Sequence, residues 1–130
     1  MIHVMDSSAL LAVSKGEMGA EAVMEILQSQ DCVISSVNMA EVATRLLDMG
    51  LPAQELARGC DQFGIDVIDF NLSQALACAA LRPLTKSAGL SLGDRACLAL
   101  AQLMKGCAVT ADHAWQDVKN AVDVEIVQIR

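Results

Sequence analysis

The sequence predicts a single α/β domain whose central parallel sheet is covered by helices on both faces. Short apolar runs alternate with amphipathic helical segments along the chain, and no repeat, linker or low-complexity segment divides its 130 residues. Hydrophobic residues make up 54% of the chain and aromatic residues only 2%, so the core must be aliphatic. We therefore expect one domain over residues 1–130.

The first fifty residues contribute two of the expected strands and three of the expected helices. Residues 2–5 are a short apolar run closed by Asp6, which predicts a strand, then a turn, then a helix from Ala9. Apolar side chains three and four residues apart predict an amphipathic helix at residues 19–28. Residues 32–34 predict a second strand. The helix after it is bounded by capping and stopping residues: Ser35 or Ser36, and Gly50.

The rest of the chain repeats this alternation. Further helices are expected to begin at Pro52, at Asn71 or Ser73, and at Ser91. Further strands are expected at residues 67–68, 107–110 and 124–127, with a turn or short helix at residues 111–115. Residues 84–90, which follow Pro83, are expected to form the longest loop of the chain.

Charge and cysteine content exclude several classes of protein. Nine Lys and Arg against sixteen Asp and Glu give a formal net charge of −7, so binding of RNA or DNA would need a metal ion or a local basic cluster. The five cysteines are scattered without a C-x-x-C, which indicates buried thiols rather than disulfides or a zinc site. With no signal peptide and no apolar stretch near the ~20 residues of a membrane helix, we expect a soluble cytoplasmic protein.

Four acidic residues are expected at one edge of the sheet. The carboxyl ends of parallel strands share an edge, and open α/β sheets bind ligands there. Asp6 and Asp112 follow strands, while Glu41 and Asp94 lie in early turns of helices that start at this edge. Unpaired carboxylates ~4 Å apart repel by roughly 4 kcal/mol per pair, so a divalent cation is the expected neutraliser. All-oxygen donors favour Mg²⁺ or Mn²⁺.

Each of these acids also has a purely structural interpretation. Asp6 and Asp112 suit the N-caps of the helices that follow them, and Asp94 completes an S-x-x-D capping pattern. Glu41 suits an i, i+4 ion pair with Arg45. Against these interpretations, Asp94 lies on the apolar side of its helix and Glu41 has apolar neighbours, so both are expected to be turned inward and only partly exposed.

Other residues near these segments are expected to have simpler roles. His3, inside the first strand, and His113 are expected to be structural or exposed rather than metal ligands. Asp117 is expected to be exposed and Trp115 to be packed in the interior. Arg95 marks the solvent side of its helix, either as a solvated arginine or as a phosphate contact.

Four segments carry these acids in a specific order: DSSAL at residues 6–10, NMAEV at 38–42, LSLGDRACLA at 90–99 and VTADHAW at 109–115. Their order, spacing and complete set resemble the PIN-domain nucleases, and specifically the VapC-type toxins of bacterial toxin–antitoxin pairs. The resemblance spans nearly the whole chain. It implies a three-layer α/β/α PIN-like domain.

The resemblance also implies a Mg²⁺- or Mn²⁺-dependent endoribonuclease. Its catalytic acids would be Asp6, Glu41, Asp94 and Asp112. Asp6 and Asp94 would be the firmest metal ligands, and Asp112 would assist directly or through water. Glu41 would hold or position a water molecule. Ser7 and Thr110 resemble family positions that support the site by hydrogen bonds.

The implied partners are an RNA substrate, such as a structured tRNA or rRNA loop, a cognate antitoxin that covers the acidic crevice, and a second copy in a homodimer. The basic residues available for RNA are few, and include Arg45, Lys86 and Arg95. One alternative is a catalytically inactive PIN-like module that only binds a partner. Another is a protein with an aspartyl-phosphate, such as a receiver domain or a haloacid-dehalogenase-like phosphatase, but Ser8 stands where such a phosphatase needs a second Asp.

Overall fold

The structure, a computed structural model, describes all residues 1–130 and is built on a five-stranded sheet. Every neighbouring pair of strands is parallel, and the strand order is β3-β2-β1-β4-β5. The strands are β1 (His3–Met5), β2 (Cys32–Ser35), β3 (Asp66–Ile68), β4 (Cys107–Thr110) and β5 (Glu125–Gln128). The first strand of the chain is therefore the central one, flanked by β2 and β4.

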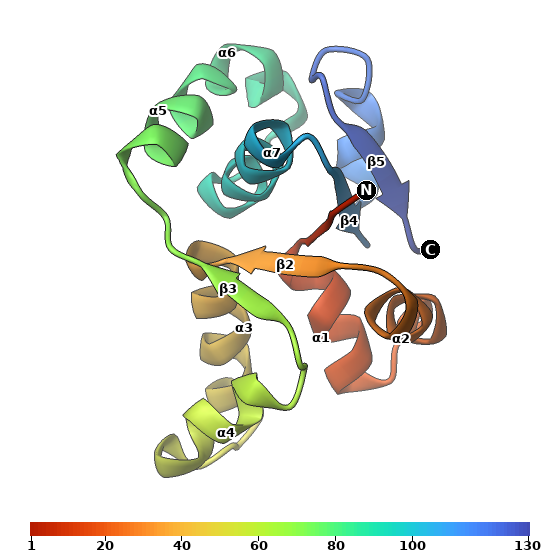
Figure 1. The fold of residues 1–130 in the computed structure, drawn as a ribbon, viewed down its shortest axis with the longest axis vertical. Coiled ribbons are helices and arrows are strands. Elements are labelled where there is room, and N and C mark those ends of the chain that lie inside the picture. The colour runs from red at the N-terminus through yellow and green to blue at the C-terminus, as the bar shows by residue number, and fades with distance from the viewer.

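Helices cover both faces of this sheet (Figure 1). One face is covered by α1 (Ser7–Lys15), α2 (Ala20–Ser29), α3 (Ser36–Asp48) and α4 (Leu56–Asp61), the last preceded by the 3-10 turn η1 (Ala53–Glu55). The other face is covered by α5 (Leu72–Ala80), α6 (Arg82–Thr85), η2 (Lys86–Ala88), α7 (Leu92–Met104) and η3 (His113–Asp117). The predicted three-layer α/β/α architecture is confirmed.

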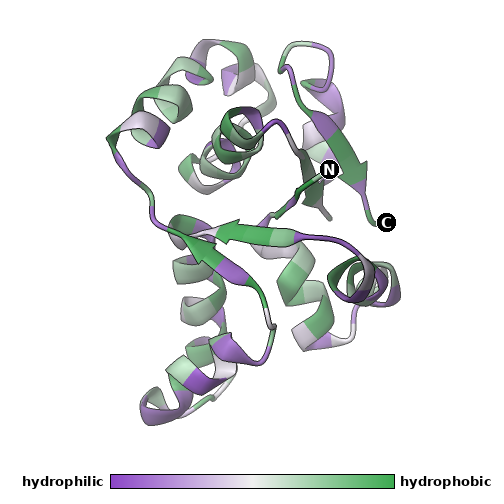
Figure 2. Ribbon diagram, in the orientation of Figure 1, coloured by the Kyte–Doolittle hydropathy of each residue, from purple (hydrophilic) through white to green (hydrophobic).

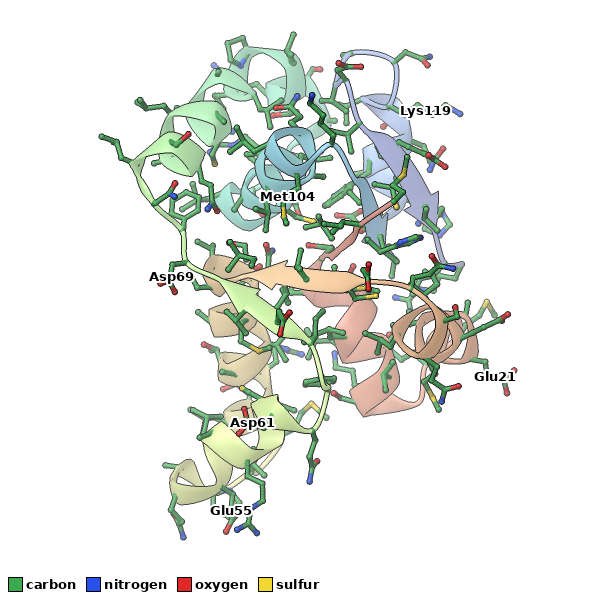
Figure 3. The ribbon with its side chains drawn as sticks, viewed as in Figure 1. Glu21, Glu55, Asp61, Asp69, Met104 and Lys119 are labelled. Atoms are coloured by element: carbon green, nitrogen blue, oxygen red, sulfur yellow. The ribbon has the colours of Figure 1, made fainter.

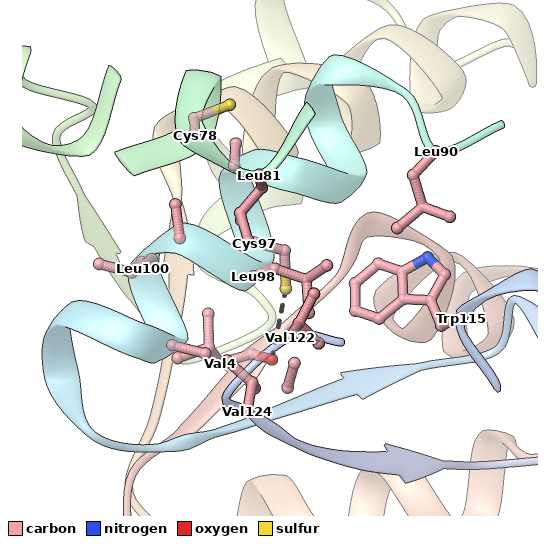
Figure 4. Packing of buried hydrophobic residues seen from close by; sticks show 14 of the residues in the cluster. Val4, Cys78, Leu81, Leu90, Cys97, Leu98, Leu100, Trp115, Val122 and Val124 are labelled. Atoms are coloured by element: carbon pink, nitrogen blue, oxygen red, sulfur yellow. Dashed lines mark hydrogen bonds between the residues drawn. The ribbon is translucent and has the colours of Figure 1, made fainter. Parts of the chain in front are cut away.

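Alternate residues of the central strands supply two separate cores. Val4 joins the core under α7, whereas the next residue, Met5, joins the core under α1 and α3. A strand buried on both faces has apolar residues along its length rather than in alternation, as the hydropathy colouring of β2 shows (Figure 2). In the α7 core, Leu98 and Trp115 are among the largest fully buried side chains (Figure 4). Helix α7 is thereby fixed against the sheet.

The structure corrects the expectation of a long loop at residues 84–90. This segment contains the end of α6 and the turn η2. Pro83 does not interrupt the helix here, because it occupies the first turn of α6, where no helical hydrogen bond needs its missing N–H. Thr85 is buried, and its hydroxyl donates a hydrogen bond of 2.9 Å to the carbonyl of Leu81. Residues 84–90 therefore form packed helical turns and not an open loop.

Two further findings concern the chain as a whole. All five cysteines are free thiols, of which Cys78, Cys97 and Cys107 are buried. No helix combines the length and the hydrophobicity needed to cross a bilayer.

Candidate active site

The sheet topology brings the four acids to one edge. Asp6 follows β1, and its N–H donates to the carbonyl of Val109 in the adjacent strand β4 at 2.9 Å. Asp112 lies two residues beyond β4, and Glu41 lies in the second turn of the helix that follows β2. Asp94 is in the first turn of α7. The three central strands therefore place Asp6, Glu41 and Asp112 at their common carboxyl edge, and the start of α7 brings Asp94 within reach of Asp6, as the sequence predicts.

Asp6 is the most deeply buried of the four acids, with 2% of its surface exposed. It occupies the N-cap position of α1, but its side chain makes no capping hydrogen bond, so the N-cap interpretation is wrong. Its Oδ2 accepts hydrogen bonds from Ser8 Oγ at 2.6 Å and from Thr110 Oγ1 at 3.0 Å. These donors come from two different segments and turn the carboxylate towards the interior of the edge.

Burial raises the pKa of Asp6 to about 7, from its ordinary 3.8. The negative charges of Asp94 and Glu41 contribute to this rise in pKa, and the hydrogen bonds from Ser8 and Thr110 oppose it. The charges of two of the other acids therefore act on Asp6 across the edge. No Lys, Arg or His forms an ion pair with any of the four carboxylates.

Asn38 connects Asp6 with Glu41. Its side chain is fully buried, and Nδ2 donates to Glu41 Oε1 at 3.1 Å and to the carbonyl of Gly93 at 3.0 Å, with Asp6 Oδ1 at 3.5 Å. All three neighbours are acceptors, so the amide must present its nitrogen to them. Ser7 Oγ donates to the same Glu41 oxygen at 3.1 Å. The Glu41 carboxylate is therefore oriented by two donors.

One expectation for Glu41 is corrected: its side chain is exposed rather than only partly exposed, because an open groove of about 480 Å³ between α1 and α3 lies beside it. The alternative structural interpretation, an ion pair with Arg45, is wrong, since Arg45 instead lies 3.8 Å from Asp48. Glu41 also lies against α7, because a Cβ added to Gly93 would collide with its carboxylate.

Asp94 has the structural role that its sequence pattern predicts. Its N–H donates to Ser91 Oγ at 3.2 Å, and its Oδ2 accepts from the Ser91 N–H at 2.8 Å, which completes a capping box. Burial raises the pKa of this half-buried carboxyl, the two Ser91 hydrogen bonds oppose the rise, and the charge of Asp112 adds to it. Asp94 therefore serves the helix and faces the other acids at once.

Asp112 also has the predicted capping role. Its Oδ1 accepts from the N–H of Ala114 at 2.9 Å at the start of η3. Its own N–H donates to Thr110 Oγ1 at 3.0 Å, and that hydroxyl donates onward to Asp6. A single threonine thus couples the position of Asp112 to that of Asp6.

The four acids share one edge but do not form a complete cage for a metal ion. No group of three His, Cys, Asp or Glu side chains converges closely enough for that. The reason is visible in their hydrogen bonds, because Asp94 and Asp112 are turned to their own helix ends and Glu41 is turned to Asn38. The assignment of Asp6, Asp94 and Asp112 as metal ligands stays a prediction.

Three residues at the edge were not assigned roles from the sequence. Ser8 holds Asp6 and also accepts the N–H of Ala111 at 2.9 Å, Asn38 links Asp6 to Glu41, and Gly93 makes room for the Glu41 carboxylate. Asn38 could have been found from its spacing, because residues three apart share one face of a helix. The contacts of Ser8 and Gly93 depend on the packing of distant segments.

The other expectations have mixed outcomes. Arg95 is half-buried rather than on the solvent side, because α5 packs over it and its Nη1 donates to the carbonyl of Cys78 at 3.1 Å. Trp115 is fully buried, and Asp117 and His113 are exposed, as expected. His3 is half-buried in β1.

A cysteine lies directly beneath the acidic edge. Cys97 is fully buried in α7, and its Sγ donates to the carbonyl of Val4 at 3.7 Å (Figure 4). Burial raises the pKa of this thiol well above its ordinary value, and the charges of Asp6, Asp94 and Glu41 raise it further. The thiol therefore stays protonated.

The sequence and the fold are both similar to known proteins. Residues 4–121 match the family described as PIN domain. A chain of the toxin–antitoxin complex from Klebsiella pneumoniae is similar in fold, with 20% sequence identity, a TM-score of 0.76, and coverage of 98% of this chain and 98% of that chain. No curated protein sequence matches this chain.

Two further structures share the fold at low sequence identity. A chain of the DNA-bound VapBC from Salmonella typhimurium has 14% identity and a TM-score of 0.74, and covers 100% of this chain and 99% of that chain. A chain of VapBC2 from Rickettsia felis, bound to a DNA fragment from the promoter, has 17% identity and a TM-score of 0.73, with 98% of each chain covered. The similarity extends over the full length in each case.

Proposed function

Because this chain belongs to the PIN-domain family, we propose that it is a metal-dependent endoribonuclease and the toxin of a VapC-type toxin–antitoxin pair. The reaction is hydrolysis of an RNA phosphodiester by water, without a covalent enzyme intermediate. Structured tRNA or rRNA loops are the proposed substrates. Five free thiols suit a reducing compartment, which fits action in the cytoplasm.

The residues at the acidic edge fit a hard divalent cation. Every candidate donor is a carboxylate oxygen, and no basic side chain neutralises the four acids. Asp6, Asp94 and Asp112 would hold Mg²⁺ or Mn²⁺. Such an ion, when bound, polarises a phosphate and lowers the pKa of water.

The protein's own groups would then orient the reactants. Ser8 and Thr110 hold Asp6 in place through the hydrogen bonds to Oδ2. Glu41, oriented by Asn38 and exposed at the groove, is placed to hold the attacking water by a hydrogen bond. Its exposure leaves room for an RNA strand beside it.

A single observation carries this proposal: a nearly fully buried carboxylate, Asp6, whose pKa is raised to about 7 and which neither caps its helix nor pairs with a basic side chain. Such a group destabilises the folded state. A cation bound between Asp6 and the neighbouring acids would compensate for this cost.

The proposed partners follow from the comparisons and from two surfaces. Similar chains occur in complexes described as toxin–antitoxin complexes, which supports a cognate antitoxin that covers the acidic edge. The groove beside Glu41 could take an arginine from that partner, since a guanidinium suits carboxylates. A homodimer is supported by α5, which has no charged residue and exposes Leu72 and Leu76 by 73% and 63%.

The test is cleavage of a broad set of RNAs by the purified protein. We expect cleavage with Mg²⁺ or Mn²⁺, none with EDTA, and none from Asp6→Asn or Asp94→Asn. Asp117→Asn is the matched control, because Asp117 is an exposed acid in η3. The cations should also raise the melting temperature of wild type and of this control, but not of Asp6→Asn.

Failure to cleave any RNA, or equal cleavage by wild type and Asp6→Asn, would overturn the proposal. A protein that binds an antitoxin but does not cleave RNA would instead match the alternative of a PIN-like interaction module.

A further inference from the structure

The segment between Asp69 and Asp94 contains no acidic residue, although sixteen of the 130 residues are acidic. It comprises α5, α6 and η2, and we call residues 70–93 the acid-free arm. The arm carries two basic residues, Arg82 and Lys86, in a chain with a net charge of −7. All of the negative charge therefore lies elsewhere.

Both basic residues of the acid-free arm are available for an external partner. Arg82 opens α6 and Lys86 opens η2, and both side chains are exposed. Neither forms an ion pair. By contrast, four of the chain's other basic residues are paired with acids: Lys15, Arg45, Arg58 and Arg130.

The acid-free arm borders the acidic edge. Turn η2 packs against η3, the element that Asp112 caps. The arm then runs through Gly89 and Leu90 into the capping box of Asp94. The N–H of Leu90 donates to the carbonyl of Thr85 at 3.4 Å, which holds this connection to α6. Lys86 therefore sits on a packed element that leads to both of these acids.

Acidic side chains are carried instead by the rest of the chain. Figure 3 shows Glu21 on α2, Glu55 on η1, Asp61 on α4 and Asp69 after the end of β3. A polyanion is repelled by such carboxylates and attracted by the two unpaired cations of the acid-free arm.

We propose that the RNA backbone reaches the acidic edge across α6 and η2, with Arg82 and Lys86 contacting its phosphates. The inference rests on the proposed function, because it takes RNA to be the substrate. Two of the basic residues that the sequence suggested for RNA binding are not free to contact RNA. Arg45 is paired with Asp48, and Arg95 is covered by α5. Contact through the acid-free arm also explains how a chain of net charge −7 holds a polyanion.

The test compares two double variants of the full chain. The first is Arg82→Ala with Lys86→Ala. The control is Lys105→Asn with Lys119→Ala, which removes two unpaired, exposed lysines that line one cleft at the other end of α7. Asparagine is chosen at position 105 because the backbone there is left-handed, with φ of 54°. Melting temperatures verify that both variants fold.

Two measurements are made with a single-stranded RNA over a range of salt concentrations. Binding is measured by fluorescence anisotropy without divalent metal, and cleavage is measured with Mn²⁺. The arm variant should bind at least about tenfold more weakly, which is the loss of one charged hydrogen bond. The slope of the logarithm of its binding constant against the logarithm of the salt concentration should become shallower by about 1.4, at roughly 0.7 for each of two lost phosphate contacts. KM should rise while kcat stays unchanged, and the control should match wild type.

Equal binding by wild type and the arm variant, an equal loss in the control, or no RNA binding by wild type would each overturn the arm proposal. The proposed function fails separately. If the wild type binds RNA through Arg82 and Lys86 but never cleaves it, the proposed nuclease activity is wrong and the proposed RNA contact by the acid-free arm is retained.

Discussion

The two halves of the acidic edge are held in different ways. Asp94 and Asp112 are each turned to a helix end within three residues of themselves. Asp6 and Glu41 accept local hydrogen bonds from Ser8 and Asn38. Each also accepts one from a distant segment: Asp6 from Thr110, 104 positions away, and Glu41 from Ser7, 34 positions away. The first pair would be explained by local structure alone, whereas the second pair would not.

This difference bears on what each acid contributes to the stability of the fold. A carboxylate that caps a helix stabilises the fold, so its presence needs no further reason. Asp6 instead carries the cost of burial without capping a helix or pairing with a cation. The comparison therefore predicts opposite effects on stability for substitutions in the two halves.

The largest expected effect is on the pH dependence of stability through Asp6. Its folded pKa of about 7 exceeds the ordinary 3.8, so the folded state binds this proton more tightly. The free energy of unfolding should therefore fall as pH rises from about 4 to about 7, by up to ~4 kcal/mol. Asp6→Asn should remove most of this slope. Urea denaturation of metal-free protein at pH 5, 6 and 7.5 measures it.

Asp117→Asn is the control for that experiment, because it removes the same charge at an exposed position. If Asp6→Asn kept the slope of wild type, the two halves would not differ in the way described.

A smaller effect is expected at Asn38, the residue that joins Asp6 to Glu41. Asn38→Ala removes the donor to Glu41 Oε1 and should reduce RNA cleavage by about 10–100-fold, the usual cost of losing a residue that orients a functional group. Steady-state cleavage rates measure it. The control is Ser29→Ala in α2, which should leave cleavage intact because the Ser29 hydroxyl bonds only the carbonyl of Glu25 in its own helix, at 2.8 Å.

The smallest expected effect is on the stability that Asp112 contributes as a helix cap. Asp112→Ala should lower the free energy of unfolding by about 1 kcal/mol, whereas Asp112→Asn should not, because asparagine caps equally well. Both substitutions should reduce cleavage alike. Thermal denaturation paired with the cleavage assay separates the two roles, and a stabilising Asp112→Ala would contradict the capping assignment.

Much of the fold follows from local patterns in the sequence. The strand at 107–110 and the helix ended by Gly50 were predictable because a run of apolar residues and a serine cap are short-range signals. The helical turns at residues 84–90 were not predictable, since they depend on the burial of Thr85, whose hydroxyl bonds the carbonyl of Leu81. The preceding proline gave the opposite indication.

The candidate site divides in the same way. Topology sufficed to gather Asp6, Glu41, Asp94 and Asp112 at one edge, because parallel strands align their ends. Exposure did not follow from the sequence, as Glu41 shows, since the groove beside it forms between two helices from different parts of the chain. The hydrogen bonds of Ser8 depend on such distant contacts too.

The buried thiol of Cys97 lies beneath the acidic edge without taking part in it. Thiolates bind Zn²⁺ tightly and react with oxidants, whereas a protonated thiol does neither readily. Burial in the core is the main reason that this thiol stays protonated, and the charges of Asp6, Asp94 and Glu41 add to it. If the edge takes a cation as proposed, this sulfur is therefore not among the donors, because it is fully buried and donates its proton to the carbonyl of Val4.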